Sequence, residues 1–179
     1  MTSLEVQAGR LEAIWLKRVR LGPMDPVRKA ELQAGRGITG NADFGGRRQV
    51  TILDAGEWER RLSGLGSDLD PSFRRANLLV RGVDLAESRG RILAVGDCRI
   101  RIDGETKPCA LMDEYLPGLR PALYERWGGG AWGAVVTGGP IALGDPVGWA
   151  DVVGREIGND TAAAAEKAVF HDPSETKKP

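Results

Sequence analysis

Arg91-Ile92-Leu93-Ala94-Val95-Gly96-Asp97-Cys98-Arg99-Ile100-Arg101-Ile102 is the stretch of sequence that decides the fold. Its first half is a short aliphatic run that stops at the turn pair Gly96-Asp97. Its second half alternates strictly, which places Cys98 and the two following isoleucines on one face of a strand and the arginines on the other. The stretch therefore predicts two consecutive β-strands separated by a turn, and Gly104 is expected to end the second strand.

Further strands are expected on both sides of this stretch. The 25 glycines and 10 prolines of the chain divide its apolar runs into strand-length pieces. These pieces lie at 11–19, 27–32, 49–53, 77–82, 132–137 and 146–150. A glycine loop at 35–37 ends the second piece, and glycine turns at 138–140 and 144–145 lie between the last two. Many short strands with glycine at the corners predict a mainly β fold, either a β-barrel or a strongly bent sheet.

Helices are expected to be few and short. Asp54 is an acceptable N-cap for a short helix at 57–62. Residues 111–127 are helix-like, but their prolines predict two short pieces rather than one helix. The alanine-rich segment 161–170 favours helix, and the polar residues after it are typical of a chain end. We therefore expect one barrel domain over 1–153, followed by a C-terminal helix and flexible tail over 154–179.

The composition excludes several classes of protein. The chain has 25 basic and 25 acidic residues, and this zero net charge argues against nucleic-acid binding. Its most apolar stretch, 131–150, is interrupted by glycines, prolines and an aspartate, so it is not a membrane helix. The N-terminus lacks the apolar run of a secretory signal, and two cysteines are too few for a disulfide framework. We expect a cytoplasmic protein with neither a nucleic-acid nor a membrane partner.

Cys109 is the most informative candidate for chemistry. It follows Pro108, which restrains the backbone just before the thiol, and Lys107 is close in sequence. Neighbouring cations favour the reactive thiolate. The pattern alone fits both a reactive thiol and a small buried side chain without chemistry. Cys98 alternates with core isoleucines, so it is expected to be structural.

Arginine pairs precede two of the expected strands. Arg47-Arg48 comes before the strand at 49–53, and Arg74-Arg75-Ala76-Asn77 leads into the strand at 77–82. The guanidinium fork suits phosphate or carboxylate, and the Asn77 amide adds further donors. Solvated surface charge is the alternative for either pair taken alone. The single histidine, His171, lies near the C-terminus, which argues against a histidine-based triad or metal site.

Taken in order, these segments resemble the MOSC domain, the C-terminal module of molybdenum-cofactor sulfurases that also occurs in small stand-alone bacterial proteins. The resemblance covers about 34–147. It rests on the glycine loop 37–40, on 48–53, 75–85, 90–97, Pro108-Cys109 and the closing segment 138–147. Two positions depart from the family pattern: Ala76 replaces an acid, and Asn41-Ala42-Asp43 without a histidine replaces Gly-Asp with a nearby histidine.

The resemblance implies a β-barrel-like fold, a pterin–molybdenum cofactor and a cysteine, Cys109, that carries sulfur or ligates the metal. It makes Arg48, Arg75, Asn77 and Lys107 candidates for binding the cofactor. Its multi-domain members bind pyridoxal phosphate on a separate desulfurase domain, so none is expected on this chain. The implied partner is a cysteine desulfurase or an electron-donor protein.

Three functions follow from the resemblance and the residues. In the first, Cys109 receives sulfur as a persulfide and passes it to molybdenum cofactor or another acceptor. In the second, the Cys109 thiolate ligates molybdenum in a reductase of N-hydroxylated substrates that takes electrons from an external donor; soft thiolate ligation suits either case. In the third, the domain binds cofactor or a partner without catalysis, and its cysteine is structural.

Overall fold

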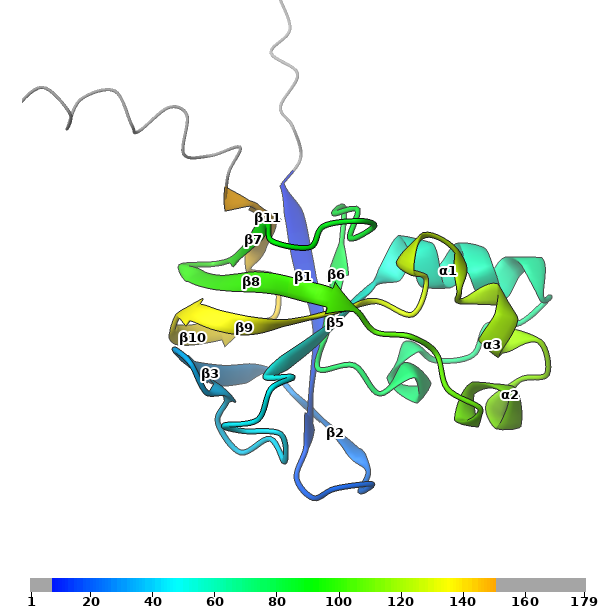
Figure 1. Ribbon diagram of the computed structural model, residues 1–179, viewed down its shortest axis with the longest axis horizontal. Helices are drawn as coiled ribbons and strands as arrows, with labels where there is room; N and C mark the ends of the chain where they lie inside the picture. The colour runs from blue at the N-terminus through cyan, green and yellow to red at the C-terminus, as the bar shows by residue number, and fades with distance from the viewer. Residues whose placement is uncertain (1–7, 151–179) are drawn as a thin grey trace, which may run out of the picture.

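The computed structural model describes residues 8–150, and seven of its strands close into a β-barrel (Figure 1). Their order around the barrel is β11-β7-β8-β9-β5-β6-β1, and pairing of β11 with β1 closes the ring. This confirms the expected mainly β, barrel-like fold. The barrel strands are β1 (Gly9–Lys17), β5 (Val50–Asp54), β6 (Leu78–Arg81), β7 (Ile92–Val95), β8 (Cys98–Glu105), β9 (Ala131–Thr137) and β11 (Pro146–Trp149).

Four short strands lie outside the closed ring. β2 (Met24–Val27) pairs with β1, whereas β10 (Gly139–Ala142), β3 (Lys29–Gln33) and β4 (Gly37–Ile38) form a separate three-stranded sheet. The expected single strand at 27–32 is therefore wrong, because Arg28 separates two strands that pair with different partners. The expected turn at 138–140 is also wrong, because Gly139 and Pro140 pair with β3.

The β7–β8 hairpin confirms the strand pattern of residues 91–102. Val95 pairs with Cys98 across the turn, and the Cys98 side chain is fully buried in the barrel. Gly104 does not end β8 as expected, because the strand continues to Glu105 through a register shift against β9. A Cβ at Gly104 would lie 3.1 Å from the Trp132 indole nitrogen, so glycine makes room for that ring.

Three short α-helices of the described chain cover one side of the barrel (Figure 1). They are α1 (Ala55–Gly64), α2 (Leu111–Tyr115) and α3 (Leu119–Ala122), and two 3-10 helices accompany them, η1 (Pro71–Arg74) and η2 (Glu125–Trp127). Asp54 caps α1 as expected, since its carboxylate accepts from the backbone N–H of Gly56 and Glu57. The helices pack on the barrel through an apolar core that is separate from the barrel interior and includes Trp58 and Met112.

The predicted division of the chain at residue 153, and the predicted C-terminal helix and tail, lie outside the described residues. Within residues 8–150, no helix is long and apolar enough to span a membrane.

Candidate functional site

A cavity of about 450 Å³ opens where the segment after β8 faces the loops before β5 and β6. Every residue predicted to form a site lines it, although these residues lie far apart in the sequence: Arg48, Arg75, Asn77, Lys107 and Cys109. The barrel brings them together because β5 and β6 run parallel side by side, which places the loops that precede them at one rim. We call this space the Cys109 cavity.

Cys109 lies exposed at this rim, between the buried Pro108 and helix α2. Cys98 is the other free cysteine of the chain, and it is buried in the barrel core as expected. Burial raises the pKa of the Cys98 thiol, and the nearby carboxylates of Glu31, Asp97 and Asp145 raise it further. The two thiols therefore differ in access, and burial further holds the Cys98 thiol in its protonated form.

Native alkylation tests this difference. Iodoacetamide at neutral pH is expected to modify Cys109 within minutes and to leave Cys98 unmodified, because alkylation requires an accessible thiolate. Both cysteines are expected to react once the protein is unfolded in guanidinium chloride. Intact-mass analysis counts the adducts and peptide mapping locates them. Modification of Cys98 in the folded protein would contradict the assignment.

Arg74 is the functional candidate that sequence reasoning missed in favour of its neighbour Arg75. Its side chain is only 7% exposed; Nε donates to the Gly129 carbonyl (2.8 Å) and Nη2 to the Thr106 carbonyl (2.9 Å). Burial lowers the pKa of Arg74 to about 10; negative charge at Cys109 acts to raise it, and the Arg48 guanidinium to lower it. Arg74 thus stays charged at neutral pH, next to the thiol. The Arg-Arg pair was visible in the sequence, but its buried member was not.

The Cys109 cavity is strongly electropositive although the chain has no net charge. Five basic side chains line it, and Asp43 is the one carboxylate among its described lining residues. Asp43 is already paired with Lys17 at 2.7 Å. The remaining basic residues are Arg48, Arg74, Arg75 and Lys107. Such a concentration of positive charge in a concave site attracts anionic ligands.

Asn77 lines the same cavity, but its side-chain amide makes its hydrogen bonds to other protein groups. Its Oδ1 accepts from the backbone N–H and the hydroxyl of Thr51. Its Nδ2 donates to the Trp15 carbonyl (3.1 Å) and to Asn41 Oδ1 (3.2 Å). These bonds use both amide donors and both lone pairs of the carbonyl. Asn77 therefore joins β1 to the loops before β5 and β6, and so holds the cavity wall in shape.

Thr106 places an unpartnered polar group beside the thiol. Its hydroxyl is buried and makes no hydrogen bond within the protein, although the residue lines the cavity. Buried polar groups almost always find a partner, so this buried hydroxyl without one is an exception within a residue that lines the cavity. Its carbonyl is held by Arg74, which fixes the chain three residues before Cys109.

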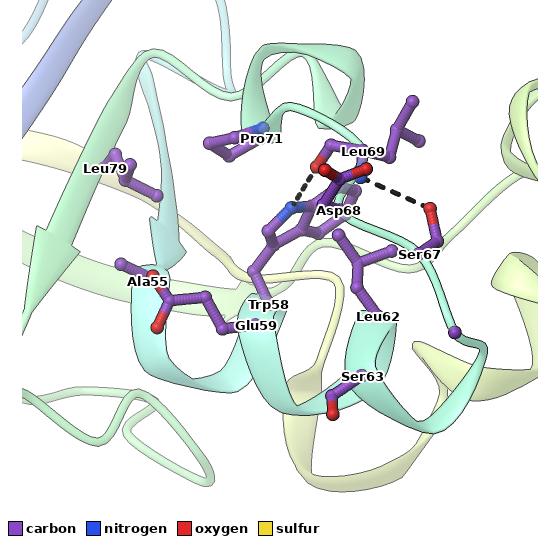
Figure 2. Close-up of a pocket in the computed structure, with 11 residues that line it drawn as sticks. Ala55, Trp58, Glu59, Leu62, Ser63, Ser67, Asp68, Leu69, Pro71 and Leu79 are labelled. Carbon is purple, nitrogen blue, oxygen red and sulfur yellow. Dashed lines mark hydrogen bonds between the residues drawn. The ribbon is translucent and has the colours of Figure 1, made fainter.

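A second cavity, of about 680 Å³, lies between α1 and residues 66–71 and is a poor candidate for an anion site (Figure 2). Trp58 lines this cavity and donates its indole N–H to the Leu69 carbonyl at 3.0 Å. Its lining contains Glu59 and Asp68 but no basic residue, and none of the predicted site residues. Larger volume alone does not identify the functional site.

The sequence model of the MOSC domain matches residues 39–148, which is more than half of the chain. The chain belongs to the MOSC domain family. No curated protein matches this MOSC protein significantly. Of the residues that depart from the family pattern, Ala76 packs in the helix-side core and Asn41 is buried against β1.

Solved structures from bacteria share the fold of this MOSC protein. The YuaD protein of Bacillus subtilis aligns with a TM-score of 0.67 and 20% identity, over 78% of this chain and 94% of that one. YiiM of Geobacillus stearothermophilus gives 0.61 and 16%, over 79% and 74% of the two chains. YiiM of Escherichia coli gives 0.58 and 14%, over 78% and 69%. At these identities the likeness concerns the fold alone.

Proposed function

We propose that this MOSC protein binds molybdenum cofactor in the Cys109 cavity and carries sulfur on Cys109. The observation that carries the proposal is an accessible thiol at the rim of an electropositive cavity. The cations favour both an anionic ligand and the thiolate form of the cysteine. Family membership independently associates this fold with molybdenum cofactor.

The residues of the cavity fit such a cofactor. A volume of about 450 Å³ lies within the usual range of small-molecule sites. Arg48, Arg75 and Lys107 would bind anionic groups of the cofactor. When bound, the cofactor supplies a soft metal that accepts sulfur ligands.

Cys109 would be the ligand for that metal, because it supplies the one thiolate donor among the described residues that line the cavity. The described residues contain no cluster of three or more His, Cys, Asp or Glu side chains able to hold a metal ion by themselves. The metal would therefore arrive with the cofactor's own ligands. Asn77, with its amide fully used, maintains the wall rather than contacting the cofactor.

Sulfur carriage requires one exchange at Cys109. The Cys109 thiolate attacks the outer sulfur of a donor persulfide; the donor S–S bond breaks, and the donor leaves as a thiolate. A new S–S bond forms on Cys109, and the transferred sulfur keeps its oxidation state, so no external oxidant or reductant is consumed. In the reverse exchange an acceptor thiolate attacks the outer sulfur, the S–S bond to Cys109 breaks, and Cys109 leaves as a thiolate, so this step also consumes no oxidant or reductant.

A mass measurement tests the proposal. The protein is incubated with a purified cysteine desulfurase and free cysteine, and intact mass is recorded for wild type, Cys109→Ser and Cys98→Ala. We expect a gain of one sulfur atom in wild type and Cys98→Ala that is absent in Cys109→Ser. Bound molybdenum is measured on the same samples.

The alternative functions give different results. Loss of molybdenum in Cys109→Ser, with no persulfide in any variant, would instead support the direct metal ligand of a reductase. If Cys109→Ser changes neither sulfur loading nor metal content, Cys109 is a structural cysteine. That result would refute both the sulfur-carrier role and the metal-ligand role.

A further inference from the structure

The turn between β1 and β2, residues 18–23, exposes apolar side chains at a conformational cost. Leu21 is 86% exposed and Val19 is 61% exposed. Leu21 also has φ of +63°, a left-handed conformation that glycine or asparagine adopts far more readily than leucine. A single exposed leucine is ordinary, but two apolar side chains on one strained turn are not what solubility or folding favours.

This turn forms part of the rim of the Cys109 cavity. Leu21 and Met24 line the cavity, and Arg75 Nη2 donates to the Gly22 carbonyl at 2.7 Å. Arg75 therefore anchors the turn to the loop before β6. The exposed leucine is held beside the opening that leads to the thiol.

A second apolar group lies next to the same opening. Phe73 is 40% exposed and packs edge-on against Tyr115, with ring centroids 4.9 Å apart. Both rings line a shallow pocket that shares Met24 and Arg75 with the Cys109 cavity. Apolar side chains from β2, η1, α2 and the turn thus flank a basic cavity, an arrangement typical of interaction surfaces.

We propose that the β1–β2 turn docks a sulfur-donor protein, with Leu21 as the central contact. This inference rests on the proposed function, because direct exchange between two cysteines requires the donor surface to seat at the rim. Arg48, Arg75 and Lys107 of the cavity, together with the exposed Arg20 on the turn, give this rim an excess of positive charge. They select a donor whose persulfide lies in an acidic surface with an apolar recess.

The experiment compares a protein donor with a small one. The initial rate of persulfide formation on Cys109 is measured by intact mass, first with a purified cysteine desulfurase plus cysteine, then with inorganic polysulfide. Leu21→Asp is expected to slow loading by the desulfurase about tenfold or more, as loss of a central contact does. Loading by polysulfide is expected to slow by a clearly smaller factor, because the new carboxylate at the rim repels an anionic donor but Cys109 itself is unchanged.

Two further variants exclude trivial explanations. Leu143→Asp places the same substitution at a 37% exposed leucine in the turn between β10 and β11, which lines neither pocket, and is expected to load like wild type with both donors. Leu21→Gly relieves the left-handed strain, so it is expected to melt no lower than wild type yet to load slowly from the desulfurase. That combination distinguishes a docking residue from a structural one.

Several outcomes would overturn the proposal. Equal rates for wild type and Leu21→Asp with the desulfurase would remove the docking role, and so would equal slowing with polysulfide. Wild type that loads from polysulfide but not from the desulfurase would refute docking while leaving sulfur carriage intact. Wild type that loads from neither donor would refute the proposed function as well. A membrane-binding turn would give a different result. Wild type would then sediment with anionic lipid vesicles, Leu21→Asp would not, and the rate of loading by the desulfurase would be the same in both.

Discussion

Gly129→Ala is expected to lower the free energy of unfolding by about 3 kcal/mol, the upper end of the cost of overpacking. A Cβ at Gly129 would lie 2.4 Å from the Thr106 carbonyl oxygen and 3.1 Å from Arg74 Nη2. The nearest atom belongs to the backbone, so rotation of a side chain does not relieve the clash. The strand end that leads to Cys109 must move instead, and both hydrogen bonds of Arg74 are strained with it.

Thermal or urea unfolding measures this effect, with Gly64→Ala as the matched control. Gly64 is the last residue of α1, and a Cβ there meets no atom within 4 Å. In a helix, alanine is favoured over glycine by up to about 1 kcal/mol, so the control is expected to be neutral or slightly stabilising. If Gly129→Ala is as stable as Gly64→Ala, the backbone at Thr106 moves to accommodate the added methyl group without lowering the free energy of unfolding, and the prediction is wrong.

Arg74→Met is expected to slow alkylation of Cys109 by iodoacetamide at neutral pH about tenfold or more. The guanidinium is buried, charged at neutral pH and electrostatically coupled to Cys109. The interaction between two unit charges near a protein surface is on the order of 1 kcal/mol or more, and Arg74→Met removes this favourable interaction with negative charge at Cys109. Methionine keeps much of the side-chain volume, so packing changes less than charge.

Arg74→Lys separates charge from position. Lysine keeps the positive charge but not the fork that binds the Gly129 and Thr106 carbonyls together. If the positive charge controls the reactivity of Cys109, Arg74→Lys is alkylated nearly as fast as wild type. If the hydrogen bonds to the two carbonyls control it, Arg74→Lys is alkylated as slowly as Arg74→Met. Unchanged alkylation in both variants would show that Arg74 only supports the fold. The melting temperature of each variant shows whether the protein remains folded under the assay conditions.

Local sequence was sufficient wherever a property depends on adjacent residues. Alternation from Cys98 to Ile102 predicted a strand with one buried face because successive side chains of a strand point to opposite sides. Asp54 predicted the start of α1 because its carboxylate reaches backbone N–H groups two and three residues away. Local sequence alone left Cys109 open between a reactive and a structural thiol, and the family resemblance favoured the reactive one.

The errors of sequence reasoning occurred where a strand depends on a distant partner. Residues 27–32 were predicted to form one strand, but β2 pairs with β1 whereas β3 pairs with β10. Gly139 and Pro140 were predicted to form a turn, yet they belong to β10 because they pair with residues of β3. Gly104 read as a strand end, but Trp132 needs the space that a glycine leaves within β8.

The sequence by itself determined the local elements, the mainly β class and the residue types of the candidate site. Only the tertiary structure decided how they meet. Pairing of β11 with β1, from opposite ends of the described chain, closes the barrel. The parallel pairing of β5 with β6 brings the loops before them to one rim, where residues 48, 75 and 77 line one cavity with residues 107 and 109. The tertiary structure also decided that Arg74 is the buried cation and that Asn77 is fully bonded within the protein, because burial and hydrogen-bond partners depend on segments tens of residues apart.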